Sequence, residues 1–428
     1  MSRKLWAVLA LLLSFALVAA ACGSDDDDDG GDDSSTTTAA ADDGGDEGAD
    51  EGVDEAGGDG GDSFVTLDQA CADAGGLEAP DGFRVNLITD IGKVDDGTFN
   101  QFAFEGMTAA NECFGIEDSD FIETQSEADY AANIATSLES DPNVLVTVGF
   151  LITSDTEEAA NNNPDVNFIG IDQFLPEYPS NMAGVQFNED ESGYIAGVMA
   201  ASLSESGVVG VVAGREDVPP VVKFVNGYTV GAEATNPDVR VLSIYNESFT
   251  DIAKGASDAA QFIGEGADVI FGAGGQTGSG GIAAAAEQGA WAIGVDQDEY
   301  FTTFASGDAP GSEFLASSAI KRVDLVTFRL IQAAVEDAFT DGLIVGTAAN
   351  DLITYAPPHD ADVPAEVLEA VEAARVGLAV GNIMTGICAI DGLFIGENSA
   401  CDDAAPTDDT TTTTAGGGEE TTTTTAAE

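Results

Sequence analysis

The chain has 428 residues, and its 78 acidic against 12 basic residues give a formal net charge of −66 at pH 7. A surface of that sign repels nucleic acid and anionic lipid, so no nucleic-acid partner is expected. A single histidine leaves no Ser–His or Cys–His pair for nucleophilic catalysis and no histidine-based metal site.

The first 21 residues have the features of a secretory signal peptide. Arg3 and Lys4 precede an apolar run from Leu5 to Ala20, which is shorter than the roughly 20 residues needed to span a bilayer. Cys22 follows three small residues, as in the lipobox of bacterial lipoproteins. We expect Cys22 to be lipidated and to anchor the protein at the outer face of the cytoplasmic membrane. An ordinary signal peptide with an incidental cysteine is the alternative.

Two segments flank the folded body. Residues 22–63 consist mainly of Asp, Glu, Gly, Ser, Thr and Ala, and residues 402–428 are rich in Thr, Gly and Glu. Such compositions bury too little apolar surface to offset the backbone entropy lost on folding. We expect an acidic disordered tether and a disordered tail, respectively.

Between these segments, short apolar runs alternate with stretches of helical spacing. The expected strands are Arg84–Thr89, Val144–Val148, Asn167–Ile171, Gly184–Gln186, Val208–Val212, Val239–Ile244, Val269–Phe271 and Trp291–Val295. The expected helices are Phe99–Cys113, Glu191–Ser204, Val221–Ala234, Ile252–Gly264 and Gly280–Gln288. This alternation predicts an α/β fold of two similar lobes, each a parallel sheet flanked by helices.

Four cysteines lie in the body, at positions 71, 113, 388 and 401. An even number in an extracytoplasmic protein indicates disulfides, and four cysteines allow three pairings. The sequence-local pairing, Cys71–Cys113 and Cys388–Cys401, would staple the two ends of the body. The alternative is four unpaired, buried cysteines.

Carboxylates and glycines recur directly after the predicted strands. In open α/β sheets, ligands bind at the carboxyl ends of the strands, so these positions are candidate binding residues. They are Asp90, Gly149–Phe150, Asp172, Gly214, Gly272–Gly275 and Asp296. Any single one of them could instead be a turn or a helix cap.

Four separated motifs resemble the basic membrane protein family, also called the PnrA-like lipoproteins. They are VNLITDIGKVDDGTFNQFAFEGM, GVVGVVAGREDVPPVVKFVNGYTVGA, GADVIFGAGGQTGSGGIAAAAEQGAWAIGVDQD and SSAIKRVD. The resemblance covers about residues 84–385 and implies a two-lobed fold of the type I periplasmic-binding kind. Its members are solute-binding lipoproteins of ABC importers, and the best understood of them bind purine nucleosides.

The resemblance implies where a nucleoside would bind. Phe99 and Phe224 would sandwich the base, since stacking on an aromatic ring stabilises a base by about 1–3 kcal/mol. Asp296 would accept hydrogen bonds from the ribose diol, with Lys321 as an accompanying donor. Asp172 and Asn100 are candidates for the base edge or the 5′ side, and Asp90 could also bind the ligand. Gly274 would let the backbone approach the sugar closely. Asp90 could alternatively orient Asn100.

The sequence also differs from the family pattern. Gly97 stands where the family has Lys, and Val222-Lys223 stands where it has Arg-Arg. Both changes remove positive charge, and we interpret them as surface adaptation. Asp96 is expected to cap the helix that begins near Phe99, since Asp is a favoured N-cap.

We divide the chain into a first lobe of residues 84–187 plus 298–323 and a second lobe of residues 188–297 plus 324–400. The chain should cross between the lobes near Asn188, Asp298 and Asp324, and the lobes should close around the ligand.

The expected partners are a nucleoside and the permease and ATPase of an ABC importer, and the protein should be a monomer without a cofactor. Alternatives are a surface receptor signalling to a membrane sensor, a sugar ligand, or a paired-carboxylate nucleoside hydrolase. The glycine-rich run GAGGQTGSGG lacks the Lys-Ser/Thr of a P-loop.

Overall fold

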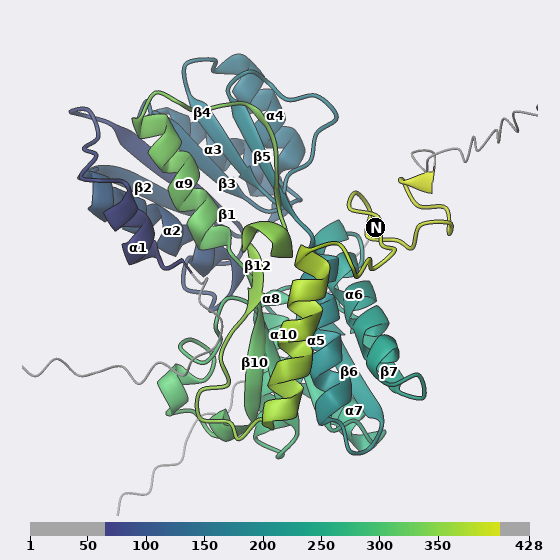
Figure 1. Cartoon of the computed structure of the whole chain (residues 1–428). Coiled ribbons are helices and arrows are strands. Elements are labelled where there is room, and N and C mark those ends of the chain that lie inside the picture. Colours follow the sequence, from purple (N-terminus) through teal and green to yellow (C-terminus); the bar gives the residue numbers. More distant parts are fainter. Residues whose placement is uncertain (1–64, 403–428) are drawn as a thin grey trace, which may run out of the picture. The chain divides into compact units, whose positions relative to one another are not determined.

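The computed structural model describes residues 65–402 (Figure 1). The predicted signal peptide, the lipidation site Cys22, the tether and all but the first residue of the tail lie outside the described residues. Two six-stranded sheets carry the fold, and we call the halves built on them the first and the second lobe. No helix within residues 65–402 is long and apolar enough to cross a membrane.

The first lobe is built on a parallel sheet in the order β11-β5-β4-β3-β1-β2. Its strands are β1 (Arg84–Ile91), β2 (Asp118–Thr124), β3 (Val144–Val148), β4 (Asn167–Ile171), β5 (Met182–Phe187) and β11 (Gly342–Gly346). Its helices are α1 (Leu67–Asp73), α2 (Phe99–Phe114), α3 (Tyr130–Leu138), α4 (Thr153–Asn162) and α9 (Val323–Val335). The central strand β3, Val-Leu-Val-Thr-Val, is buried throughout because helices cover both faces of a parallel sheet.

The second lobe repeats this plan in the order β12-β10-β9-β8-β6-β7, with β12 antiparallel to β10. Its strands are β6 (Val208–Ala213), β7 (Arg240–Tyr245), β8 (Val269–Ala273), β9 (Trp291–Asp296), β10 (Leu315–Lys321) and β12 (Ile353–Tyr355). Its helices are α5 (Glu189–Leu203), α6 (Pro219–Thr235), α7 (Ile252–Gly264), α8 (Gly275–Ala286) and α10 (Ala365–Ala379). The predicted two-lobed α/β fold is therefore confirmed.

The predicted division of the chain between the lobes is wrong after residue 297. Residues 298–322 do not belong to the first lobe, because β10 pairs in parallel with β9 and so joins the second sheet. Conversely, α9 packs on α2, and β11 pairs with β5, so residues 323–346 return to the first lobe. Residues 347–400 lie with the second lobe, where α10 packs on α5 (Figure 1).

Three connections join the lobes. The chain passes between them at Asn188, at Arg322 and through residues 347–352. The predicted crossings near Asn188 and Asp324 lie within two residues of observed ones, whereas none occurs near Asp298. The cause is the β9–β10 pairing, which keeps the chain in the second sheet until Arg322.

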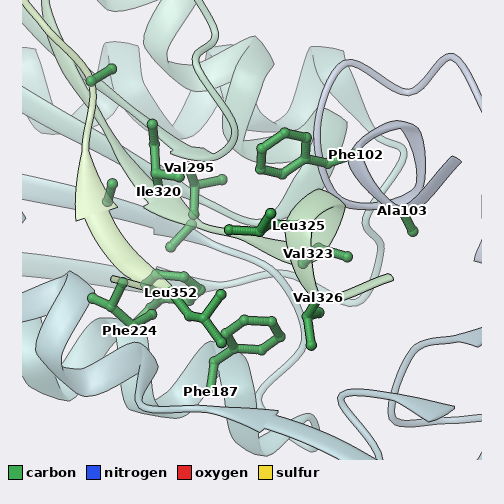
Figure 2. Close-up of a cluster of buried hydrophobic side chains, with 14 of the residues drawn as sticks. Phe102, Ala103, Phe187, Phe224, Val295, Ile320, Val323, Leu325, Val326 and Leu352 are labelled. Carbon is green, nitrogen blue, oxygen red and sulfur yellow. The ribbon is translucent and has the colours of Figure 1, made fainter. Parts of the chain in front are cut away.

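An apolar core continues from one lobe into the other around these connections. Figure 2 shows Phe187, Phe224 and Leu352 in one cluster with Val323 and Val326, which draws side chains from both lobes. All five are buried. The connections are thus packed segments rather than loose linkers.

Two disulfides fasten the ends of the described chain. Cys71 bonds to Cys113, which ties α1 to α2, and Cys388 bonds to Cys401 beyond α10. These are the sequence-local pairs, one of the three pairings that four cysteines allow. The C-terminal loop closed by the second disulfide lies on the second lobe, where Asn226 Nδ2 donates to Gly392 O at 2.7 Å.

Candidate functional site

The candidate site is a cavity between the two lobes, formed by loops at the carboxyl ends of the strands. Its volume is about 650 Å³ counting its opening to solvent. The eight residues predicted to bind a ligand all line it: Asp90, Phe99, Asn100, Asp172, Phe224, Gly274, Asp296 and Lys321. Both lobes contribute because the carboxyl ends of both parallel sheets face this space.

Helix α2 begins at the cavity, and its first turn is fixed by Asp96. The two carboxylate oxygens of Asp96 accept from the backbone N–H groups of Thr98, Asn100 and Gln101 at 2.9–3.2 Å. Asp96 therefore caps the helix, as predicted. Its Oδ2 also accepts from Asn100 Nδ2 at 3.0 Å, while Asn100 Oδ1 accepts from the Asp90 backbone N–H at 2.8 Å. Both ends of the Asn100 amide are thus positioned by the first lobe.

Asp90 lies at the end of β1 and is 8% exposed. Its Oδ1 accepts from the Tyr130 hydroxyl and from the Ile91 N–H. Burial raises the pKa of Asp90 to about 6, although the Tyr130 hydrogen bond opposes that rise. Tyr130 was missed by the sequence reasoning because it lies on α3, 40 residues away.

Each lobe presents one carboxylate from the same short sequence. Gly170-Ile171-Asp172-Gln173 spans the end of β4, and Gly294-Val295-Asp296-Gln297 spans the end of β9, the matching strand of the second lobe. Asp172 and Asp296 both adopt left-handed backbone conformations, with φ of 59° and 67°. Such strain in a non-glycine residue persists where the surrounding structure imposes it, and it concentrates at functional sites.

Both carboxylates keep an acceptor atom available. Asp172 Oδ1 and Asp296 Oδ1 are buried and accept no hydrogen bond from any residue between 65 and 402. Burial raises the pKa of Asp172 to about 6 and that of Asp296 to about 7, against the opposing charge of Lys321. A buried acceptor of this kind is stabilised by a ligand that donates a hydrogen bond to it.

Lys321, the last residue of β10, lies between these carboxylates. Its Nζ is 2.7 Å from Asp172 Oδ2, 3.3 Å from Glu189 Oε1 and 3.9 Å from Asp296 Oδ1. Burial favours a lower pKa for Lys321, but the three carboxylates outweigh it and hold that pKa above its usual value. The ammonium therefore stays charged and balances part of the negative charge of the cavity.

Glu189 and Lys223 complete this buried charge cluster, and the sequence reasoning missed both roles. Lys223 is 1% exposed, forms an ion pair with Glu189 and donates to Phe187 O at 2.7 Å. Our interpretation of Val222-Lys223 as surface adaptation is wrong, because both side chains are buried and that of Lys223 reaches the connection between the lobes. The acidic start of α5, Glu-Asp-Glu directly after a strand, was the available signal.

Four phenylalanines line the cavity. Phe99 and Phe224, the predicted pair, come from α2 of the first lobe and α6 of the second. Phe224 also packs edge-to-face on Phe271 at 6.1 Å, so it is a core residue and a lining residue at once. Phe150 and Phe249 line the cavity as well. Phe150 was among the residues expected to follow a strand, whereas Phe249 lies in the loop after β7 and was missed.

The start of α8 approaches the cavity closely because it is built from glycine. A Cβ at Gly274 would lie 2.4 Å from Gly214 N, so any side chain there would push the two loops apart. The chain's one histidine, His359, bonds to Asp298 at 2.6 Å and stacks on Tyr300, and it does not line the cavity.

Two α/β lobes joined by three connections around a polar and aromatic cavity define the class of extracytoplasmic solute-binding proteins. The family model of ABC transporter substrate-binding proteins, PnrA-like, matches residues 84–349, and the chain belongs to this family.

Relatives and solved structures agree with this assignment. The chain is 32% identical to the ABC transporter nucleoside-binding protein BmpA of Lactococcus lactis, over 61% of this chain and 78% of that protein. It is 31% identical to basic membrane protein D of Borreliella burgdorferi, over 60% and 73%, respectively. A solute-binding protein of an Aeropyrum pernix ABC transporter system superposes with a TM-score of 0.61 at 25% identity, over 71% of this chain and 92% of that one.

Proposed function

We propose that the protein captures a purine nucleoside in the interlobe cavity and delivers it to the permease of an ABC importer. The observation that carries the ligand assignment is the pair Asp172 and Asp296, each with a buried acceptor oxygen beside Lys321. The proposal is supported by the name of the Lactococcus relative, a nucleoside-binding protein. A lipid on Cys22 would hold the protein at the outer face of the cytoplasmic membrane, where two acyl chains give stable anchoring.

The base would stack between Phe99 and Phe224. Both rings lie close to Lys321, whose Nζ is 4.5 Å from the Phe99 centroid and 5.8 Å from that of Phe224. A flat, uncharged guest gains stacking from both lobes, at about 1–3 kcal/mol for each base–aromatic contact. Phe150 and Phe249 extend the apolar lining around it.

The ribose would be recognised through its hydroxyls. The 2′ and 3′ hydroxyls are adjacent donors, and Asp296 can accept from both while Lys321 donates to a hydroxyl oxygen. Asp172 and Asn100 would contact the base edge or the 5′ hydroxyl. Closure of the lobes removes water from these bonds and strengthens them, because the local dielectric constant falls.

Delivery would depend on hinge motion at the three connections. A ligand that contacts both lobes favours their closed arrangement by its difference in affinity for the two arrangements. The permease would then recognise the closed form and release the nucleoside as the lobes open.

A ligand screen tests the proposal. The chain from residue 22 onward, carrying Cys22→Ser so that it stays in solution, is screened by thermal shift and calorimetry. The ligands are adenosine, guanosine, inosine, cytidine, the free bases, ribose and glucose. We expect purine nucleosides to raise the melting temperature, since a ligand that binds the native state stabilises it by mass action.

Two variants separate the site from general effects. Asp296→Asn should weaken the best nucleoside at least ten-fold, because a charge-assisted bond to the diol is lost. Asp238→Asn, at an exposed carboxylate in the same lobe, should leave affinity unchanged. Tighter binding of glucose or ribose than of any nucleoside would refute the proposed ligand class.

A further inference from the structure

An arginine close to the cavity joins the two lobes. Arg215 lies in the loop after β6 of the second lobe, and its guanidinium forms an ion pair with Glu127 of the first lobe. Within its own lobe, Arg215 Nε donates to Asp217 Oδ1 at 2.9 Å and Nη2 donates to Asp217 Oδ2 at 2.6 Å. These two hydrogen bonds to the Asp217 carboxylate therefore position the guanidinium for its contact with the other lobe.

The sheet order places this ion pair far from the connections. Glu127 follows β2, the edge strand opposite the β11 and β5 end of the first sheet. Arg215 follows β6, which lies beside the edge strand β7, at the opposite end of the second sheet from β12 and β10. The three connections leave strands β5, β10 and β11, so we expect a contact between the far ends to break early when the lobes open.

The ion pair is also linked to the binding residues. Glu127 begins the turn that leads into Tyr130, whose hydroxyl holds Asp90 in the cavity. On the other lobe, Val218 and Val221 follow Arg215 and line the cavity. The charge of Arg215 acts on Asp90 itself, whose pKa is raised by burial and lowered by Arg215 among smaller contributions.

The negative charge of both lobes gives an attractive contact between them a larger effect on closure. Residues 84–187 contain 19 acidic and 2 basic residues, and residues 188–322 contain 19 acidic and 6 basic residues. Closure therefore brings two lobes of strongly negative net charge together, which repel each other. Arg215 places a cation between the two lobes.

We propose that Arg215, positioned by Asp217 and paired with Glu127, is a latch residue that sets ligand affinity by holding the lobes closed, without contacting the ligand. The latch rests on the proposed function of the cavity. Since Arg215 and Glu127 have side chains 20% and 51% exposed, the latch is screened by salt.

A double-mutant cycle tests the latch on the soluble chain carrying Cys22→Ser. The variants are Arg215→Gln, Glu127→Gln and both together, with Arg240→Gln as the matched control, since Arg240 pairs with Glu265 inside the second lobe. At low salt we expect each latch variant to weaken the best nucleoside about three- to five-fold through faster dissociation. The double variant should be no weaker than either single one, and the differences should shrink at 1 M salt.

The outcomes distinguish the latch from the proposed function. Unchanged dissociation in Arg215→Gln, or additive losses in the double variant, would overturn the latch while leaving nucleoside binding intact. If no nucleoside binds the parent chain, the proposed function fails. The latch is then judged from interlobe distances, measured between spin labels on the ligand-free chain. Arg215→Gln should shift them toward the open form, and an unchanged distribution would reject the latch.

Discussion

Lys321 Nζ lies 2.7 Å from Asp172 Oδ2, and this contact joins the end of β10 in the second lobe to the loop after β4 in the first. Both side chains are buried, at 2% and 6% exposure. The same ammonium stands within 4 Å of Glu189 and Asp296, so one cation serves three carboxylates. In the function proposed above, ligand recognition and the joining of the lobes would therefore depend on the same group.

Replacing Lys321 with methionine should destabilise the fold as well as the site. The change leaves three buried carboxylates without this counter-charge, which costs about 3–5 kcal/mol for a broken buried ion pair. Urea unfolding followed by circular dichroism measures the loss. Lys93→Met, at an exposed lysine, is the control and should change stability by less than about 0.5 kcal/mol. Equal stability of the two variants would contradict the role given to the cluster.

The pH dependence of binding and of stability should have opposite signs. Burial raises the pKa of Asp296 to about 7, so the native state holds a proton that the unfolded chain has released by that pH. The contribution of Asp296 to stability is therefore largest at low pH and is lost as pH rises from about 4 to about 7. Nucleoside affinity should rise over the upper part of that interval, because the ionised carboxylate is the better acceptor for the diol.

Calorimetry and thermal unfolding between pH 5.5 and 8 measure both trends. The Asp296→Asn variant should show a flatter profile in each, because the titrating group is gone. Asp172 and Asp90, with pKa values raised by burial to about 6, add weaker trends at lower pH. A nucleoside affinity that falls as pH rises would exclude Asp296 as the diol acceptor.

Gly149 should be required for the position of Asp90. A Cβ at Gly149 would lie 2.2 Å from Asp90 Oδ2, and its φ of +106° strains any side chain. Gly149→Ala should therefore displace Asp90 and weaken nucleoside binding about ten-fold or more. Gly342→Ala is the matched control, since Gly342 has a φ of +114° and nothing within 4 Å of a Cβ. Both variants should lose stability, measured by thermal unfolding, but only Gly149→Ala should lose affinity.

The two disulfides should contribute unequally to stability. Cys71–Cys113 spans 42 residues and Cys388–Cys401 spans 13, so loop-closure entropy assigns them about 4 and about 3 kcal/mol, respectively. Urea unfolding of the paired Cys-to-Ala variants compares them. Hydrogen exchange should show that loss of Cys388–Cys401 loosens residues 383–402 and leaves the sheets protected. A larger loss of stability from the C-terminal pair would contradict this order.

The fold and most of the lining residues could be predicted because both follow from local patterns. Alternating apolar strands and helices define the two lobes, and Asp172 and Asp296 could be found because they follow buried strands directly. The edge strand β2, Asp-Ser-Asp-Phe-Ile-Glu-Thr, was missed because its first four residues are exposed and it lacks an apolar run. Strand β10 was missed because its centre is Ser-Ser-Ala.

Contacts between distant segments could not be predicted in the same way. Lys223 and Glu189 meet only because α5 and α6 pack together, and the acidic start of α5 does not by itself reveal which cation pairs with it. The predicted lobe boundary after β9 was wrong for a related reason. Which sheet receives β10 depends on pairing with β9, which no local pattern encodes.

The repeated Gly-x-Asp-Gln turn has a further consequence for release. Each lobe carries an equivalent carboxylate held by the same backbone geometry, so each lobe keeps one of the two acceptor groups when the lobes separate. A ligand that needs both carboxylates would bind weakly to either lobe alone, without any residue having to change its conformation. In the proposed function, release would then require only rotation about the connections, and the emptied lobes could bind the next molecule.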